Sequence, residues 1–291
     1  DEPLADAAAV ALYFLNREAA KDVKVVLSGE GADELFGGYN IYRDPFTARW
    51  YDRLPPWLRA GLGAAASLLP PARGVNFLVR RGMSLEERYF GPTALFNERE
   101  KRRLLADYAG DGDPMFLTEA IWDATEGLDP VTRMQQVDLN LWLAGDILLK
   151  ADRMSMANSL ELRVPFLDRK VMEFAEHIPD RYRINENGNK QVLRHAANKS
   201  LPDEWATRPK VGFPVPIVYW LREQKWYDYV KEYFTAPWAS EFFNTDELMH
   251  LLDLHFAGKG DFQRKIYTPL VFLVWYKRFF IDEDKGAEVA A

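Results

Sequence analysis

Hydrophobic and polar positions in the first forty residues follow a pattern that is typical of an α/β unit. Residues 5–22, ADAAAVALYFLNREAAKD, favour a helix, and Pro3 suits the first turn of a helix. The stretch VKVVL at residues 23–27 predicts a short, buried β-strand. Short buried strands that follow helices indicate a parallel sheet, so we expect an α/β fold for residues 1–40.

The rest of the chain has a pattern that is typical of helices and loops. Residues 41–110 contain 12 Lys or Arg against 7 Asp or Glu, and we interpret this basic bias as a solvated or partner-facing surface. Beyond them, aromatic residues are spaced along helical stretches that end at prolines. We therefore expect residues 41–285 to be mainly helical and residues 286–291 to form a frayed tail.

Composition narrows the class of protein. With 291 residues, of which 48% are hydrophobic and 28% charged, the chain has the profile of a soluble globular protein. Its longest apolar run, near residues 266–276, is far shorter than the roughly 20 residues that span a bilayer. We see neither a membrane segment nor a secretory signal, and a cytoplasmic location is compatible with the sequence.

Charge and cysteine content exclude several kinds of site. Because the chain has no cysteine, it has no disulfide, no thiolate metal site and no cysteine nucleophile. A net charge of -7 argues against nonspecific binding to nucleic acid, so small ligands or protein partners are expected. The four histidines show no spacing that predicts a metal site. The first residue is Asp1 rather than methionine, which is consistent with a start inside a longer chain.

The turn after the predicted strand is the first candidate site. Residues 28–31, Ser-Gly-Glu-Gly, lie where a parallel sheet would expose backbone N–H groups to a ligand. Glu30 in the turn and Asp33 and Glu34 just after it bring three carboxylates together, and phosphates would approach them only with a cation such as Mg²⁺ between. The alternative is a tight turn whose acids cap the next helix. The turn matches neither G-x-G-x-x-G nor a Walker loop.

Two further segments carry candidate chemistry. Residues 146–175 begin with a helical pattern that contains Lys150 and Arg153, cationic groups that could meet an anionic substrate. The alternative is that Glu161 and Arg163 in this segment form local ion pairs. Residues 208–221, RPKVGFPVPIVYWL, place Lys210 in a loop stiffened by proline and glycine. A lysine held in this way can bind a phosphate as a point charge, whereas the alternative is an ordinary solvated side chain.

Together these motifs carry a resemblance that none of them carries alone. LSGEGADELFGGY, LLKADRMSMANSLELRVPFLD and RPKVGFPVPIVYWLR occur in this order in a chain that resembles the synthetase domain of glutamine-dependent asparagine synthetases. The resemblance extends over nearly the whole chain. It implies a parallel-sheet, adenine-nucleotide alpha-hydrolase-like α/β domain, mostly helical in its C-terminal part. In that family ATP adenylates the side-chain carboxylate of aspartate, and ammonia then displaces AMP to give asparagine.

The resemblance assigns roles to the residues of the turn. Ser28, Gly29 and Gly31 are expected in the pocket for ATP and the aspartyl-adenylate. Glu30 is expected to line the same pocket and to position or deprotonate the incoming ammonia. Asp33 is expected to bind Mg²⁺.

The later motifs supply the remaining expected site residues. Lys210 resembles the lysine that stabilises charge on the transferring phosphate and pyrophosphate. Asp146 is expected to be catalytic, and Lys150 and Arg153 are expected to contact the nucleotide. The expected substrates are aspartate, ATP and ammonia derived from glutamine.

Two features of the family have no counterpart in this chain. The first is an amidotransferase domain that begins with cysteine, and the second is a pyrophosphate-binding loop of the form S-G-G-x-D-S. We therefore interpret residues 1–291 as the C-terminal part of the synthetase domain, incomplete at its N-terminus. The isolated chain is predicted to be inactive, and a homodimer is a further expectation.

Two alternatives stay open at this point. A β-lactam synthetase-like ligase would share the fold. Glu30 disfavours this alternative, because the β-lactam synthetase family, although similar, has a tyrosine at the corresponding position. The other alternative is a noncatalytic helical fragment that binds a partner, which the missing loop supports for the chain as given.

Overall fold

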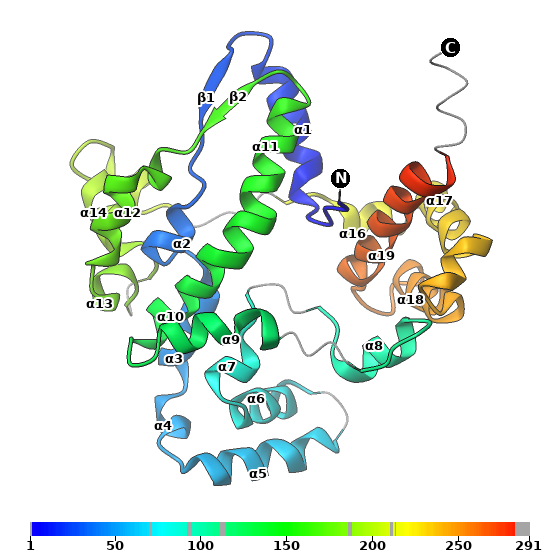
Figure 1. Ribbon diagram of the computed structural model, residues 1–291, viewed down its shortest axis with the longest axis horizontal. Helices are drawn as coiled ribbons and strands as arrows, with labels where there is room; N and C mark the ends of the chain where they lie inside the picture. The colour runs from blue at the N-terminus through cyan, green and yellow to red at the C-terminus, as the bar shows by residue number, and fades with distance from the viewer. Residues whose placement is uncertain are drawn as a thin grey trace.

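The computed structural model in Figure 1 describes residues 2–69, 72–91, 95–110, 115–185, 188–209, 212 and 214–282. The described residues form mostly helices together with one small parallel sheet. This architecture agrees with the coarse prediction of a largely helical chain that contains a parallel sheet. Among the described residues, no helix is both long enough and apolar enough to cross a bilayer.

The first element group is the predicted α/β unit. It consists of α1 (Ala8–Ala19), β1 (Val25–Leu27) and α2 (Ala32–Phe36). β1 pairs in parallel with β2 (Glu161–Arg163), which lies far along the sequence, and Val26 is opposite Leu162. α1 packs along α11 (Leu149–Met156), the helix that leads into β2, so the two strands and two helices lie together (Figure 1).

The predicted strand exists, but the prediction that it is buried was wrong. Val25 is 50% exposed and Leu27 is 76% exposed, whereas Val26 between them is partly covered. Since the sheet has only two strands within the described part of the chain, most of its surface has no neighbouring strand or helix to cover it.

A long continuous helical segment runs through the middle of the molecule. It contains α10 (Pro130–Val137), a π-helix η2 (Asp138–Leu148) and α11 (Leu149–Met156). Asp129 begins the segment, because its side chain accepts a hydrogen bond from the Thr132 N–H at 2.9 Å. The segment contacts α2 through η2 and the sheet through α11 (Figure 1).

Short helices connect the α/β unit to this central segment. Two of them form a helical hairpin whose backbones approach closely at Gly63 and Gly82. A Cβ atom added at Gly63 would lie 3.0 Å from the Gly82 Cα, and a Cβ atom added at Gly82 would lie 2.9 Å from the Gly63 Cα. The elements are η1 (Asn40–Arg43), α3 (Asp44–Thr47), α4 (Arg49–Asp52), α5 (Pro56–Ser67), α6 (Arg73–Gly82), α7 (Leu85–Arg88), α8 (Glu98–Leu104) and α9 (Met115–Ala124).

The elements after β2 form two groups. The first group packs against α2 and comprises η3 (Pro165–Leu167), α12 (Arg169–Glu176), α13 (Asp180–Arg183), α14 (Gln191–Ala197) and α15 (Asp203–Ala206). The second is a C-terminal bundle that comprises α16 (Ile217–Trp220), α17 (Gln224–Phe234), η4 (Pro237–Glu241), α18 (Thr245–Phe256), α19 (Gln263–Tyr276) and η5 (Lys277–Ile281).

The C-terminal bundle contains the largest hydrophobic core. Phe234, Leu248, Leu252, Ile266 and Leu273 are fully buried there. Burial of each such side chain stabilises the fold by about 1.5–3 kcal/mol. Residues of this bundle, of the N-terminal segment and of the central helical segment together line one cavity.

Candidate functional site

The turn of residues 28–31 lies at the carboxyl end of β1, as the sequence predicts. The Ser28 N–H donates to the Arg163 carbonyl at 2.8 Å, which fixes the end of β1 against β2. Gly31 has φ of +85°, and a Cβ atom there would lie 2.3 Å from Leu167 Cδ2. A Cβ atom on Gly29, by contrast, would meet nothing within 4 Å. Gly31 is therefore required by the fold, whereas Gly29 faces open space.

Glu30, Asp146 and Lys150, three of the predicted site residues, lie close together in the structure. The buried Lys150 ammonium forms an ion pair with Asp6 and lies 3.9 Å from Asp146 Oδ2. Glu30 interacts electrostatically with Lys150 from the turn. The sheet and the α1–α11 packing thus bring together side chains that are 120 residues apart in the sequence.

Burial controls the protonation of the two predicted carboxyl groups. Burial raises the pKa of Glu30; Lys150 opposes the rise, and Glu34, Asp33 and Asp6 add to it. Burial also raises the pKa of Asp146 to about 6, with a further rise from Asp6 and an opposing effect of Lys150. Carboxyl groups with raised pKa values can exchange protons near neutral pH, which suits general acid–base chemistry.

Asp6 is a member of the charged cluster that the sequence reasoning missed. One of its oxygens accepts from the Ala8 N–H at 2.9 Å at the start of α1, and the other binds Lys150. A carboxylate just before a helix is usually a cap, so its local sequence gave no sign of the second contact. Only the packing of α1 along α11 places it in the cluster.

Arg153 and Asp33 already have charged partners. Arg153 donates to the Glu2 backbone carbonyl and to its carboxylate, both at 2.9 Å. Asp33 lies 3.1 Å from the Lys190 ammonium, which the sequence reasoning also missed. In the described ranges no group of three or more His, Cys, Asp or Glu is arranged to hold a metal ion. A nucleotide contact for Arg153 and a Mg²⁺ contact for Asp33 therefore stay predictions.

Lys210 lies outside the described residues. The backbone just before it is anchored, because one Arg194 guanidinium nitrogen donates to the carbonyls of Ala206 and Arg208, each at 2.9 Å. Its predicted phosphate contact stays a prediction.

A cavity of about 710 Å³ adjoins the charged cluster. Asp6 and Asp146 line it on one side, and α19 lines it on the other with Arg264, Tyr267 and Thr268. Trp142, which like Asp146 belongs to η2, also lines this cavity. This space is large enough for a small polar substrate beside Asp146.

Glu34, the third carboxylate of the turn region, lines a different cavity. It is 1% exposed and accepts a hydrogen bond from the Tyr39 hydroxyl at 2.6 Å. Tyr39 in turn accepts from the Trp142 indole N–H at 3.2 Å. Glu34 therefore connects α2 to the central helical segment through Tyr39.

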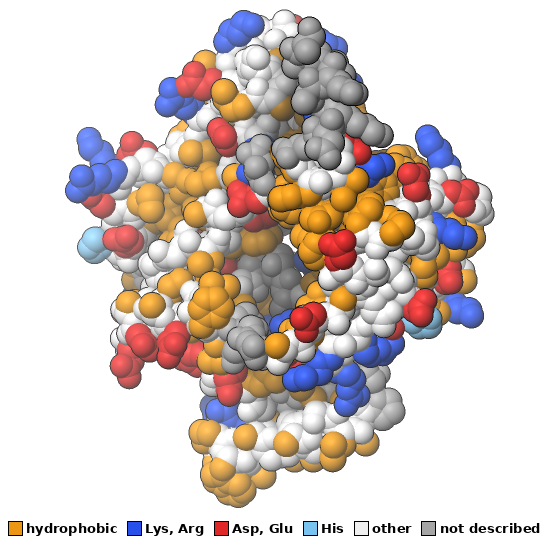
Figure 2. Space-filling view, turned by 45° about the vertical axis from the view of Figure 1, so that its right-hand side comes forward, with side chains coloured by type: hydrophobic (Ala, Val, Ile, Leu, Met, Phe, Trp, Pro, Cys, Tyr) orange, Lys and Arg blue, Asp and Glu red, His pale blue; other side chains and the backbone are white. Residues whose placement is uncertain are grey.

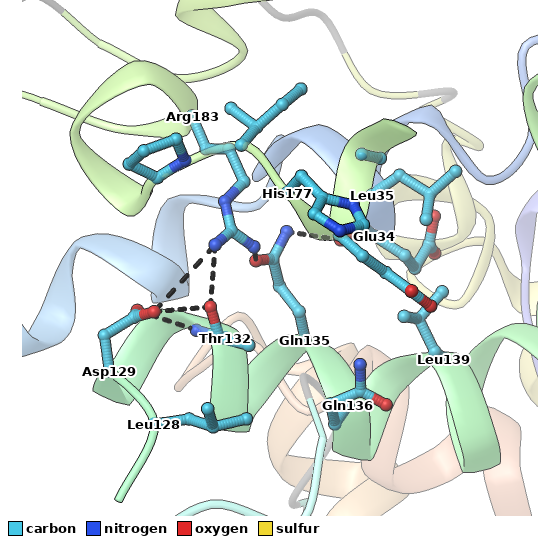
Figure 3. Close-up of a pocket in the computed structure, with 14 residues that line it drawn as sticks. Glu34, Leu35, Leu128, Asp129, Thr132, Gln135, Gln136, Leu139, His177 and Arg183 are labelled. Carbon is cyan, nitrogen blue, oxygen red and sulfur yellow. Dashed lines mark hydrogen bonds and ion pairs between the residues drawn. The ribbon is translucent and has the colours of Figure 1, made fainter. Parts of the chain in front are cut away.

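Figure 3 shows this second cavity, of about 410 Å³, which Glu34 and Leu35 of α2 line. Arg183 crosses it and donates to Thr132 Oγ1 at 2.7 Å and to the Gln135 side chain. The Gln135 amide donates to the Glu34 backbone carbonyl. Because these polar groups already bind one another, the cavity has the character of a structural contact between α2, α10 and α13.

Another buried network lies at the start of η2. Asp138 is fully buried and accepts hydrogen bonds from the Tyr42 hydroxyl and, at 2.6 Å, from the Tyr89 hydroxyl. Burial raises the pKa of Asp138 to about 7, and the two tyrosines oppose the rise. This network ties η1 and the residue after α7 to the helix that carries Asp146.

The chain is similar in sequence to known proteins. The family model described as asparagine synthase matches residues 1–277. A Mycobacterium tuberculosis protein named "Putative asparagine synthetase (glutamine-hydrolyzing)" is 44% identical over 280 residues, which cover 96% of this chain and 43% of that protein. Asparagine synthetase (glutamine-hydrolyzing) 1 of Bacillus subtilis is 42% identical over 289 residues, which cover 97% of this chain and 46% of that protein.

The chain spans less than half the length of these relatives. The match nevertheless runs through the turn of residues 28–31, the central helical segment and the C-terminal bundle. The chain therefore belongs to the asparagine synthase family.

Proposed function

We propose that this chain is the synthetase part of a glutamine-hydrolysing asparagine synthetase. In the proposed reaction, ATP adenylates the side-chain carboxylate of aspartate and releases pyrophosphate. Ammonia then attacks the acyl carbon, AMP leaves with the bonding electrons, and asparagine forms after loss of a proton. The ammonia would come from glutamine through a glutaminase domain that is not part of these 291 residues.

The observation that carries this proposal is the meeting of Glu30, Asp146 and Lys150 beside the carboxyl end of β1. In parallel α/β sheets, ligands bind at this edge of the sheet. The open space at Gly29 would let a phosphate approach the backbone N–H groups of the turn. We accordingly propose that β1 and β2 belong to a sheet of the adenine-nucleotide alpha-hydrolase type, with Ser28, Gly29, Glu30 and Gly31 around the nucleotide.

The charge of the cluster suggests different roles for its residues and for the cations outside it. Asp6, Glu30 and Asp146 supply three carboxyl groups, and Lys150 supplies one ammonium, so the cluster attracts an ammonium or amino group more strongly than a phosphate. We propose that Glu30 receives the proton that ammonia loses. Lys150 would hold the carboxylates in place, while Lys210 and Arg153 would act toward the phosphates.

The proposed Mg²⁺ contact at Asp33 fits the way that this ion binds. Mg²⁺ usually takes one or two protein carboxylates and completes its coordination with phosphate oxygens and water. One carboxylate beside the turn is therefore sufficient, and the Lys190 ammonium at 3.1 Å indicates that Asp33 can accept a cation. When bound, the ion would neutralise charge on the departing pyrophosphate.

The two alternative functions receive less support. The relatives described above are named asparagine synthetases, which does not favour a β-lactam synthetase-like ligase. A fragment that only binds a partner would not need two carboxyl groups with raised pKa values beside a buried lysine, whereas acid–base chemistry would use them.

Aspartate-dependent exchange of pyrophosphate into ATP tests the proposal on the complete protein. We expect exchange with aspartate and none when aspartate is omitted. Complete absence of exchange with an intact fold would contradict the proposed adenylation.

A further inference from the structure

His255 is a fully buried imidazole that the proposed chemistry does not use. It belongs to α18 in the C-terminal bundle. Its Nε2 atom lies 3.0 Å from the Val218 carbonyl oxygen, and its Nδ1 atom lies 3.0 Å from the Phe262 backbone nitrogen. Because a carbonyl only accepts and a backbone N–H only donates, Nε2 carries the ring proton and Nδ1 is the acceptor. Both ring nitrogens therefore bind the backbone of other elements.

The two partners of His255 are backbone groups at helix ends. Val218 belongs to α16, which has only four residues, and Phe262 directly precedes α19. The carbonyls of a last helical turn and the N–H groups at a helix start have no partner within their own helix. Asp261 Oδ1 lies 3.9 Å from Nδ1, which is too far to compete for this hydrogen bond. One side chain therefore ties α18 to α16 and to the start of α19.

Both helix ends continue into the cavity of about 710 Å³ beside the charged cluster. The residues next to Val218 and next to Phe262 line this cavity. In Figure 2 the surface is hollowed near its centre, and hydrophobic side chains border the hollow on the side of the C-terminal bundle. We call the two lining segments the α16 wall (Val215 and Ile217) and the α19 wall (Gln263, Arg264 and Tyr267).

On the basis of the proposed function, we propose that His255 is a positioning residue that fixes the α16 wall and the α19 wall relative to each other, and that the cavity receives aspartate. The carboxyl groups of Asp6 and Asp146 on one side of the cavity suit the ammonium group of an amino acid. The Arg264 guanidinium on the other side suits a carboxylate. Aspartate carries both kinds of group, whereas the two carboxyl groups would repel a phosphate.

The effect of His255 on the cavity follows from the burial of its hydrogen bonds. Loss of either bond leaves a backbone group without its partner, and that group then moves toward another one. Groups that bind a substrate must be held within about 0.5 Å of their productive positions. A shift of either wall should therefore weaken the binding of aspartate. Since His255 touches no reacting atom, the maximal rate should change little.

Two amide variants separate the two hydrogen bonds. In His255→Asn the side-chain oxygen can replace Nδ1, so the contact with Phe262 is kept and the contact with Val218 is lost. In His255→Gln the side-chain nitrogen can replace Nε2, so the contact with Val218 is kept and the contact with Phe262 is lost. The matched control is His250→Gln, because His250 is an exposed histidine on the same helix.

Aspartate-dependent exchange of pyrophosphate into ATP, measured on the complete protein, gives the first test. We expect the KM for aspartate to rise at least about fivefold in both His255 variants. The KM for ATP and the maximal rate should stay within about twofold of the original values. His250→Gln should match the unmodified protein. An unchanged KM for aspartate in both His255 variants, or an equal rise of both KM values, would overturn the proposal.

Hydrogen–deuterium exchange of the Phe262 amide gives a second test that needs no catalysis. This amide should exchange faster in His255→Gln, which loses its acceptor, and at the original rate in His255→Asn. In the unmodified protein, saturating aspartate should slow the exchange, because a substrate held between the walls stabilises the arrangement that binds it. This last measurement does not depend on the folding of any variant. The absence of any effect of aspartate would overturn the proposal.

Failure of the proposed function and failure of this proposal give different results. If the proposed function is wrong, the unmodified complete protein shows no aspartate-dependent exchange of pyrophosphate. If only the role of His255 is wrong, the unmodified protein shows this exchange and the two His255 variants keep its KM for aspartate.

Discussion

At the scale of single residues, the two carboxyl groups beside Lys150 differ in what their removal should do. Glu30 comes from the turn, and Asp146 comes from the central helical segment. The first is proposed to act on ammonia, and the second shares the Lys150 ammonium with Asp6. Each role predicts a distinct response to replacement by the neutral amide.

Glu30→Gln should separate the two halves of the proposed reaction. The amide cannot take a proton, so asparagine formation should fall by roughly 10²-fold or more, while pyrophosphate exchange stays near its original rate. Both rates are measured on the complete protein. Asp33→Asn is the matched variant, and it should lower exchange and raise the Mg²⁺ requirement. Equal losses of both rates in both variants would contradict the separate roles.

Asp146→Asn should change the pH dependence of stability. The folded protein raises the pKa of this carboxyl to about 6, so it favours the protonated form, and its contribution to stability is lost as pH rises from about 4 to 6. The amide variant should therefore gain up to about 3 kcal/mol in unfolding free energy at pH 8, and almost nothing at pH 4. Denaturant titration at the two pH values measures this, and an equal gain at both would rule out the titration of Asp146 as the cause.

At the scale of elements, the turn between β1 and α2 contains two glycines with different reasons to be glycine. Gly31→Ala should lower the unfolding free energy by about 1–3 kcal/mol, because it combines a left-handed φ with a contact of 2.3 Å to Leu167. Gly29→Ala should leave thermal stability nearly unchanged and weaken ATP binding, because only a ligand would meet the new methyl group. Thermal denaturation and nucleotide binding distinguish the two variants. A large loss of stability in Gly29→Ala would argue against an open ligand side at that glycine.

The strands show how far local sequence predicts an element. β1 is predicted, because residues 23–27 contain three β-branched valines and a leucine and precede a glycine turn. β2 gives no comparable signal, because its three residues are Glu, Leu and Arg and it forms by pairing with β1 across more than 130 residues. The exposure of Leu27 was not predicted for the same reason, since burial depends on neighbours that sequence pattern does not supply.

At the scale of the whole molecule, the 291-residue chain alone should not turn over ATP. It has no S-G-G-x-D-S stretch, and backbone donors of that kind stabilise the departing pyrophosphate. Aspartate-dependent AMP production by purified chain is the measurement, and the complete protein is the positive control. Production by the chain at a rate close to that of the complete protein would contradict this expectation.

The arrangement of the candidate site was predictable in part. The resemblance of the motifs places Glu30, Asp146 and Lys150 together, which the structure also does. Asp6 and Lys190 were missed because each has an ordinary local explanation, a helix cap and a solvated lysine, and becomes a partner only through tertiary packing. Lys210 lies outside the described residues, so its role depends on the resemblance alone.

The first described residues of the chain contact α11 at two points, and these contacts bear on the charge around Glu30. Glu2 binds Arg153 and Asp6 binds Lys150, so residues 2–6 contact α11 at two positions that are nearly one helical turn apart. Asp6 and Lys150 both act on the pKa of Glu30, in opposite directions. The position of residues 2–6 on α11 therefore contributes to the charge balance around Glu30.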